Sequence, residues 1–163
     1  MDRDRIWLGT RVPDVELAEL LDDQVVAVPT GPLFARRTSV VIGVPGAFTP
    51  VCARQHVPDF VRSAARLKAA GYDQLICVAP NDPFVLHAWS TQVDPERHIR
   101  FLSDGNLDFC TGLGLQATER DFHLGTRSER YMLIVVDGVI RRLRVEASIT
   151  AYLCTRAADA LAH

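Results

Sequence analysis

The fold is decided by one stretch of the sequence, which reads Val41-Ile42-Gly43-Val44-Pro45-Gly46-Ala47-Phe48-Thr49-Pro50-Val51-Cys52. The apolar, β-branched run at 38–44 predicts a buried central strand that ends at Pro45-Gly46. A short loop follows, and the pattern then becomes helical, with Cys52 near the start of the helix. The unpaired N–H groups and the positive end of a helix favour a thiolate at that place. The stretch therefore predicts a strand–loop–helix unit that carries a reactive cysteine.

The pattern on both sides of this unit alternates strands and helices. Apolar residues at three- and four-residue steps predict a helix from Pro50 that ends at Gly71, with a kink at Pro58. Further strands are expected at 75–79, 99–102, 131–136 and 139–145, and helices at 81–90 and 149–161. Asp137-Gly138 predicts a tight hairpin between the last two strands. This order predicts an α/β fold with a central mixed β-sheet flanked by helices, in a thioredoxin-like layout. No Gly-x-Gly-x-x-Gly follows a predicted strand, and no Walker loop occurs. The sequence therefore does not indicate a nucleotide-binding fold.

Composition limits the class of protein. A chain of 163 residues with 48% apolar and 23% charged residues is typical of one soluble globular domain, expected here over 1–163. The net charge of −2 gives no electrostatic reason to expect a nucleic acid or an anionic membrane as partner. The charged start, Met-Asp-Arg-Asp-Arg, does not resemble a secretory signal, and no apolar run approaches the ~20 residues that span a bilayer. A cytoplasmic location is therefore expected.

The four cysteines do not form a recognisable pair. Cys52, Cys77, Cys110 and Cys154 are too far apart for a Cys-x-x-Cys motif, so neither a zinc knuckle nor the usual dithiol site is indicated. We expect no metal, no cofactor and no static disulfide framework. Cys77 and Cys110 are expected to be buried apolar residues. Cys52 is the exception, because of the loop that precedes it.

Two neighbours of Cys52 have more than one interpretation. The hydroxyl of Thr49 suits a site that holds a sulfur and a substrate oxygen together, but it also suits a simple helix N-cap. His56 lies four residues after Cys52, on the same helical face. A nucleophilic cysteine with a histidine base would indicate acyl transfer, although no third, orienting group is evident. A structural or pocket-lining role for His56 is the alternative.

The stretch 45–52, with His56-Val57-Pro58 after it, resembles the active-site motif of peroxiredoxins, and more narrowly that of the type-5 group. The core pattern of that motif is proline, three residues, threonine, two residues, cysteine, and it is intact here. The resemblance covers nearly the whole chain, from about Gly9 to Leu161. Its later parts are the segments 77–85 with Trp89, 102–106 and 127–131, followed by Asp137-Gly138.

The resemblance implies a thiol-dependent peroxidase that reduces hydrogen peroxide and organic hydroperoxides. Cys52 is expected to be the peroxidatic cysteine, which attacks a peroxide oxygen and becomes a sulfenic acid. Pro45 would shield the sulfur, Thr49 would hydrogen-bond the thiolate and the peroxide, and Arg130 would contact sulfur and oxygen together. The backbone N–H groups of Val51 and Cys52 would receive charge on the leaving oxygen. The residues expected to line the substrate site are Gly46, Phe48, Val51 and His56.

Two positions qualify the resemblance. Arg127 competes with Arg130 for the role of the essential arginine, and Arg130 is preferred because it precedes the aromatic residue that opens a late strand. Asp59 stands where the type-5 group usually has glycine. A carboxylate near a thiolate would oppose its charge, so Asp59 is expected to face the solvent.

The resemblance also suggests how the sulfenic acid is reduced. Cys154 has the spacing of a resolving cysteine, but the residues before it look helical instead of glycine-rich. Two cycles therefore stay open: a disulfide between Cys52 and Cys154, or direct reduction by glutathione, glutaredoxin or thioredoxin. A homodimer is expected, with Phe48, Phe84 and Trp89 as exposed apolar candidates for the contact. A non-catalytic, thioredoxin-like protein that binds partners or senses oxidants is the alternative function.

Overall fold

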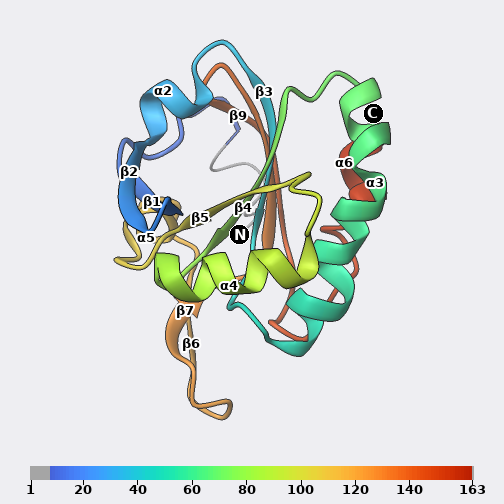
Figure 1. Ribbon diagram of the computed structural model, residues 1–163. Coiled ribbons are helices and arrows are strands. Elements are labelled where there is room, and N and C mark those ends of the chain that lie inside the picture. The colour runs from blue at the N-terminus through green and yellow to red at the C-terminus, as the bar shows by residue number, and fades with distance from the viewer. Residues whose placement is uncertain (1–7, 163) are drawn as a thin grey trace.

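The strand–loop–helix unit predicted around 41–52 is present in the structure, a computed structural model that describes residues 8–162 (Figure 1). Strand β3 (Thr38–Gly43) leads into the loop, and the helical segment after it contains a π-helical turn, η1 (Cys52–His56), that continues as α3 (Val57–Ala69). The predictions for the charged start at 1–5 and for the outermost ends of the domain lie outside the described residues.

The remaining elements follow the predicted alternation, with several additions. The other helices of the described range are α2 (Thr30–Phe34), α4 (Pro83–Val93), α5 (Asp108–Gly112) and α6 (Ala157–Leu161). The other strands are β1 (Glu16–Leu21), β2 (Gln24–Pro29), β4 (Gln74–Ala79), β5 (Arg100–Ser103), β6 (Gln116–Glu119), β7 (Gly125–Ser128), β8 (Tyr131–Val136) and β9 (Val139–Val145). The sequence patterns did not predict β1, β2, β6, β7 or α2. The outer strand β2 does contain an apolar run, Val25 to Val28, although it lies at the edge of the sheet and is largely exposed.

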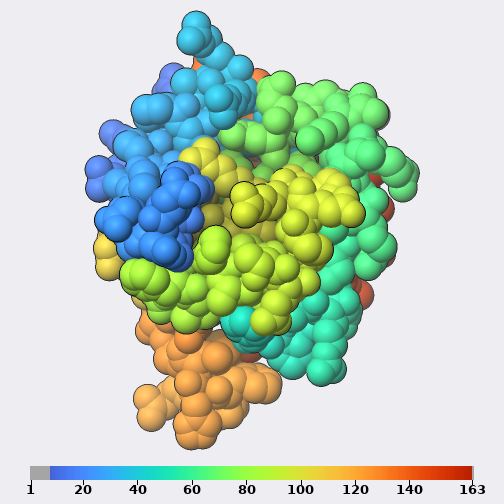
Figure 2. All heavy atoms as spheres, viewed as in Figure 1, coloured from blue at the N-terminus to red at the C-terminus, as the bar shows by residue number. Residues whose placement is uncertain are grey.

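A mixed sheet forms the centre of the fold. Its strand order is β2-β1-β5-β4-β3-β8-β9, with β3 parallel to β4 and β4 parallel to β5. The outer pairs are antiparallel, which confirms the predicted α/β architecture with a mixed sheet. Among the strands of residues 8–162, β6 and β7 pair only with each other, and Figure 2 shows this hairpin projecting from the body of the molecule.

Two apolar cores lie on opposite faces of this sheet, because successive strand residues point to opposite sides. On β3, Val40 and Ile42 belong to the core that includes residues of α3, α4 and α6. Val41 points into the other core, which contains residues of α2 and α5. Figure 1 shows α3 and α6 together on one side and α2 on the other. The carboxyl end of β3 thereby delivers the loop to a buried position.

The hairpin predicted at Asp137-Gly138 is confirmed with the expected strand bounds. Asp137 has φ 48° and Gly138 has φ 75°, which is the left-handed conformation that a two-residue turn between antiparallel strands requires. Strand β8 runs beside β3, with Tyr131 opposite Gly43. The residue before Tyr131 is therefore held close to the end of β3, where the Cys52 loop begins.

The expected helix at 149–161 is wrong over most of its length. Only α6 is helical, and residues 146–156, which we call the C-terminal segment, follow an irregular path. The reason is competition for backbone donors. The N–H groups of Leu153, Cys154 and Thr155 donate to the side chain of Glu146 instead of entering a helical ladder.

The disturbance expected at Pro58 appears as the π-helical turn that precedes it. The N–H of Val57 donates to the carbonyl of Cys52, five residues back, and Pro58 follows without a donor of its own. Across residues 8–162, each helix falls short of the length and hydrophobicity that a bilayer span requires.

Candidate active site

Cys52 lies at the start of the helical segment, as the sequence predicts, and its side chain is fully buried. The helical ladder begins with the hydrogen bond from Ala53 N to Thr49 O (2.9 Å). The N–H groups of Val51 and Cys52 precede that bond, and such groups at a helix start have no intrahelical partner. The sulfur therefore sits at the positive end of the helix.

Arg130 comes from the turn before β8 and points at this sulfur. Its Nη1 donates to Cys52 Sγ at 3.3 Å, and the same nitrogen lies 3.1 Å from His56 Nδ1. The rest of the guanidinium is held by backbone carbonyls of the C-terminal segment. Nε donates to Ala151 O at 3.1 Å and Nη2 donates to Ile149 O at 2.7 Å. Arg130, and not Arg127, is the arginine that the fold brings to the cysteine.

The burial of Arg130 makes this contact electrostatically important. The residue is 1% exposed, and a buried charge is costly unless acceptors or an opposite charge surround it. Of its four hydrogen-bond partners, two are carbonyl groups, one is a neutral imidazole and one is Cys52. Only the cysteine among them can carry a negative charge. The arrangement therefore places a buried positive charge directly against the sulfur of Cys52.

His56 is neutral, and both ring nitrogens are occupied. Burial, followed by the charge of Arg130, holds the pKa of His56 well below its usual value, although the hydrogen bond with the Thr155 carbonyl acts in the opposite direction. A neutral ring that donates from Nε2 to Thr155 O (3.1 Å) accepts at Nδ1 from Arg130. The side chain is 0% exposed and both nitrogens are engaged by protein groups, so the expected lining role of His56 at the substrate site stays a prediction that could rest only on its ring carbons. The same geometry opposes the acyl-transfer interpretation, since Nδ1 faces the guanidinium.

The loop before Cys52 is held by short polar contacts. The hydroxyl of Thr49 donates to Gly46 O at 2.7 Å, and its backbone carbonyl accepts the first bond of the helical ladder, so Thr49 occupies the N-cap position with its hydroxyl proton turned to the loop. The N–H of Ala47 donates to Asn81 Oδ1 at 2.8 Å, which ties the loop to the residue before the cap of α4. Pro45 is buried at the base of the loop. Asn81 is a site residue that the sequence indicated only as part of a helix cap.

Arg127 lies next to the same loop, at Gly46. Its Nε donates to Leu124 O at 2.9 Å within the β6–β7 hairpin. Its Nη1 approaches Gly46 so closely that a side-chain carbon there would lie 3.3 Å from it. Arg127 therefore neighbours the loop without a hydrogen bond to the sulfur.

The three aromatic residues that are expected to be exposed differ in their exposed fractions. Phe48 and Phe84 are 50% and 59% exposed, respectively, whereas Trp89 is fully buried. Trp89 lies under Phe48, with ring centroids 6.3 Å apart, and packs edge-on against Phe101. The expectation of an exposed Trp89 is wrong, because its position on α4 faces the sheet.

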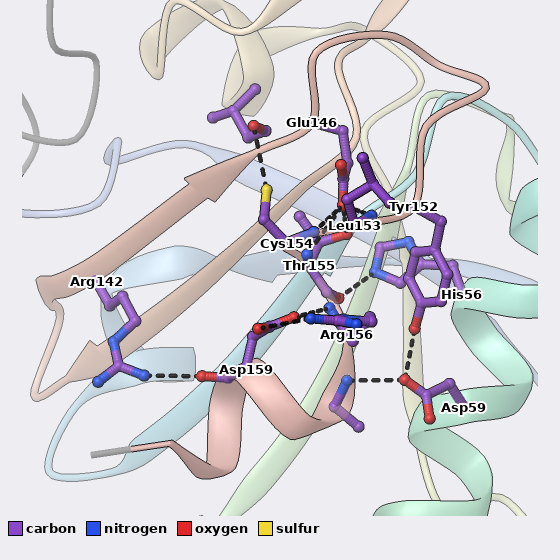
Figure 3. A network of polar contacts seen from close by, with 12 residues as sticks. His56, Asp59, Arg142, Glu146, Tyr152, Leu153, Cys154, Thr155, Arg156 and Asp159 are labelled. Atoms are coloured by element: carbon purple, nitrogen blue, oxygen red, sulfur yellow. Dashed lines mark hydrogen bonds and ion pairs between the residues drawn. The ribbon is translucent and has the colours of Figure 1, made fainter.

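The expectation that Asp59 faces the solvent is wrong. It is half-buried, and its Oδ2 accepts hydrogen bonds from the hydroxyl of Tyr152 and from Ala157 N (Figure 3). The carboxylate therefore connects α3 to the C-terminal segment and to the start of α6. Both of these hydrogen bonds lead to donors other than Cys52.

Cys154 points away from the centre of the site. Its Sγ donates to Val145 O at 3.5 Å, and Figure 3 shows the sulfur directed to that carbonyl and away from His56. Burial, and then the charge of Glu146, raises the pKa of Cys154 to about 11. All four cysteines are free thiols, and Cys77 and Cys110 are buried as predicted. Across residues 8–162, no group of three or more His, Cys, Asp or Glu side chains is arranged to hold a metal ion.

Comparison with known proteins shows the family of this chain. The Redoxin family model matches residues 8–161. Peroxiredoxin-2B of Arabidopsis thaliana is 37% identical over 87% of this chain and 88% of its own. The crystal structure of reduced Prx3 from Vibrio vulnificus in complex with hydrogen peroxide matches with a TM-score of 0.89 and 36% identity, over 96% of this chain and 97% of that one. Peroxiredoxin 5 from Alvinella pompejana matches with a TM-score of 0.79 and 34% identity, over 89% and 92%. The chain therefore belongs to the peroxiredoxin family and is a thiol-dependent peroxidase with a thioredoxin-like fold.

Proposed function

We propose that this peroxiredoxin reduces hydrogen peroxide and organic hydroperoxides with Cys52 as the nucleophile. The observation that carries the proposal is the buried Arg130 guanidinium, 3.3 Å from the sulfur of Cys52. The thiolate attacks one peroxide oxygen and the O–O bond breaks. The second oxygen takes a proton from the solvent and leaves as water or an alcohol, while the sulfur is oxidised to a sulfenic acid.

Neighbouring groups supply the stabilisation that a thiolate alone lacks. The hydroxyl proton of Thr49 is directed to Gly46 O, so the lone pairs of this oxygen are free to accept the O–H of the peroxide. The N–H groups of Val51 and Cys52, together with Arg130, would stabilise charge on the leaving oxygen. Gly46, Phe48 and Val51 would line the approach, and Pro45 would keep bulk water from the sulfur.

Substitution at Cys52 and at Arg130 tests this function. Cys52→Ser should abolish thiol-dependent loss of hydrogen peroxide and of cumene hydroperoxide. Arg130→Lys should lower the second-order rate constant about 10²- to 10³-fold, because a lysine cannot reproduce the forked donor geometry. Arg62→Lys, an exposed change on α3, serves as control and should keep the full rate. A folded Cys52→Ser protein with full turnover would refute the proposal, and an inert wild-type protein would favour the non-catalytic, redox-sensing alternative.

We propose further that an external thiol reduces the sulfenic acid in a one-cysteine cycle. Glutathione, glutaredoxin or thioredoxin would attack the sulfenic sulfur and release water, and a second thiol would then resolve the mixed disulfide. The support is the setting of Cys154, whose sulfur faces Val145 O and whose pKa is raised to about 11. A thiol with so high a pKa supplies little thiolate at pH 7.

The cycle can be tested with Cys154→Ser. We expect unchanged turnover with glutathione and glutaredoxin, and with thioredoxin, and no Cys52–Cys154 disulfide in the oxidised wild-type protein by non-reducing mass spectrometry. Loss of thioredoxin-dependent turnover, together with an intramolecular disulfide in the wild type, would establish the two-cysteine cycle instead.

The assembly and the location belong to the same proposal. A homodimer would be formed through the active-site end, where Phe48 and Phe84 are exposed close to the loop and to the start of α4.

A cytoplasmic location agrees with the proposed reductants, which are kept reduced in that compartment. Cell fractionation followed by immunodetection tests the location.

A further inference from the structure

The orientation of Arg130 depends on a segment that has no regular structure. Two of its donors, Nε and Nη2, bind Ala151 O and Ile149 O, which lie in the C-terminal segment. These two bonds direct Nη1 at Cys52 and His56. Displacement of the segment by an ångström would therefore turn the guanidinium away from the sulfur, because a planar group held at three nitrogens follows its acceptors.

A single carboxylate oxygen holds that segment in place. Oε1 of Glu146 accepts from the N–H groups of Leu153 (2.8 Å), Cys154 (2.8 Å) and Thr155 (2.9 Å), and also from the hydroxyl of Thr155 (2.9 Å). Figure 3 shows these donors converging on Glu146. The backbone of Glu146 is itself bonded to Arg130, since Glu146 N donates to Arg130 O at 2.9 Å. Glu146 is 5% exposed, so water offers its donors little competition.

The same residue also reaches the site by a second route. The carbonyl of Thr155 accepts the Nε2 proton of His56, and His56 Nδ1 in turn accepts from Arg130 Nη1. A fixed Thr155 therefore fixes the tautomer and the ring orientation of His56. Both routes, through the carbonyls at 149 and 151 and through His56, start from the donors that Glu146 collects and end at the nitrogen that faces Cys52.

We propose that Glu146 is a positioning residue for the peroxidase reaction, which acts through the C-terminal segment to aim Arg130 at Cys52 and to hold His56 against Arg130. The inference rests on the roles of Cys52 and Arg130 proposed above. Four donors at one oxygen call for a carboxylate and not for a neutral acceptor. Burial would raise the pKa of Glu146, but the donors of Cys154, Leu153 and Thr155 together outweigh burial, and the pKa is lowered.

The test compares Glu146→Gln with Glu16→Gln, an exposed change at the start of β1 that serves as the matched control. Two quantities are measured on the folded proteins: the second-order rate constant for hydrogen peroxide, and the pH midpoint at which iodoacetamide alkylates Cys52, followed on the Cys52 peptide by mass spectrometry. Glu146→Gln should lower the rate constant at least tenfold and raise the alkylation midpoint by about one pH unit, since the thiolate loses its aimed guanidinium. Glu16→Gln should change neither quantity.

A purely structural role would give a different result. A lower melting temperature for Glu146→Gln, with an unchanged midpoint and rate constant for the folded fraction, would overturn the proposal. If Glu146→Gln does not fold, Thr155→Val removes one of the four donors at nearly constant volume, and Thr155→Ser restores the hydroxyl. Thr155→Val should shift the midpoint upward and Thr155→Ser should return it; equal midpoints in the two variants would refute the inference. The midpoint needs no peroxide, so an inert wild-type protein would count against the proposed function alone.

Discussion

His56 shows how one side chain can be structural and still belong to the chemistry. It has no free nitrogen for a substrate, yet it presents a lone pair to the nitrogen of Arg130 that contacts Cys52. A protonated ring would place an N–H against that guanidinium, in a site that excludes water. The interaction therefore requires the neutral imidazole, and the lowered pKa of His56 is the consequence.

This requirement predicts an acid-labile contribution to stability. The folded protein keeps His56 neutral, whereas the unfolded chain binds a proton below the ordinary value of about 6.5. Unfolding therefore takes up one proton, and the free energy of unfolding should fall by up to about 1.4 kcal/mol per pH unit as the pH drops below about 6.5. Urea unfolding of the wild type and of His56→Asn between pH 7.5 and 5 measures it. The variant should have the smaller slope, and parallel curves would contradict the assignment.

At the scale of elements, the end of β3 and the start of β8 form one unit that positions the site. Tyr131 is paired with Gly43, and a Cβ on Gly43 would lie 2.0 Å from the Tyr131 ring. The ring therefore occupies the space that any other residue at position 43 would fill. Because Arg130 precedes Tyr131 and the Cys52 loop follows β3, this one close approach sets the distance between the two halves of the site.

Gly43→Ala should consequently damage both stability and reactivity. We expect the free energy of unfolding to drop by roughly 1–3 kcal/mol, as for other overpacked cores, and the rate constant with peroxide to fall as Arg130 moves. Gly31→Ala in α2 is the matched control, because, apart from its chain neighbours and the backbone of α2, no atom of the described residues lies within 4 Å of the added carbon. It should leave both quantities unchanged or raise stability slightly, since alanine is the better helix former. Equal unfolding curves for the two variants would show that the Tyr131 ring yields without cost.

At the scale of the whole molecule, the site draws on segments far apart in the sequence. The loop at 45–52, the turn before β8 and the C-terminal segment converge at one end of the sheet, beside the exposed rings of Phe48 and Phe84. Exposed aromatic side chains of this kind favour association, because they supply large apolar area at low cost in conformational entropy.

Phe84→Glu should therefore weaken the proposed dimer. We expect the wild-type protein to sediment as a dimer at micromolar concentration, and the variant to sediment as a monomer at the same concentration. Phe122→Glu, which changes another exposed ring at the tip of the β6–β7 hairpin, controls for a general effect of added charge. A monomeric wild type, or equal dissociation of both variants, would place the contact elsewhere.

Local patterns along the chain are enough to predict the central features of this protein. A buried β-branched run ending at Pro45-Gly46 and a helix carrying Cys52 follow from local patterns, as does the hairpin at Asp137-Gly138, because strand burial, helix starts and tight turns depend on neighbouring residues. The resemblance of the stretch 45–52 to the peroxiredoxin motif, with Arg130 before Tyr131, implied the peroxidase chemistry.

The surroundings of the sulfur, in contrast, depend on how distant segments pack together. The bond from Tyr152 to Asp59 joins residues that are distant in sequence. The four donors on Glu146 give the C-terminal segment its irregular path, in competition with the helix that local propensity favours. The orientation of His56 toward Arg130, and of Cys154 toward Val145, is likewise set by partners that lie beside them in the fold. Local patterns do not contain these choices, because the energy that decides them comes from burying and satisfying polar groups when distant segments meet.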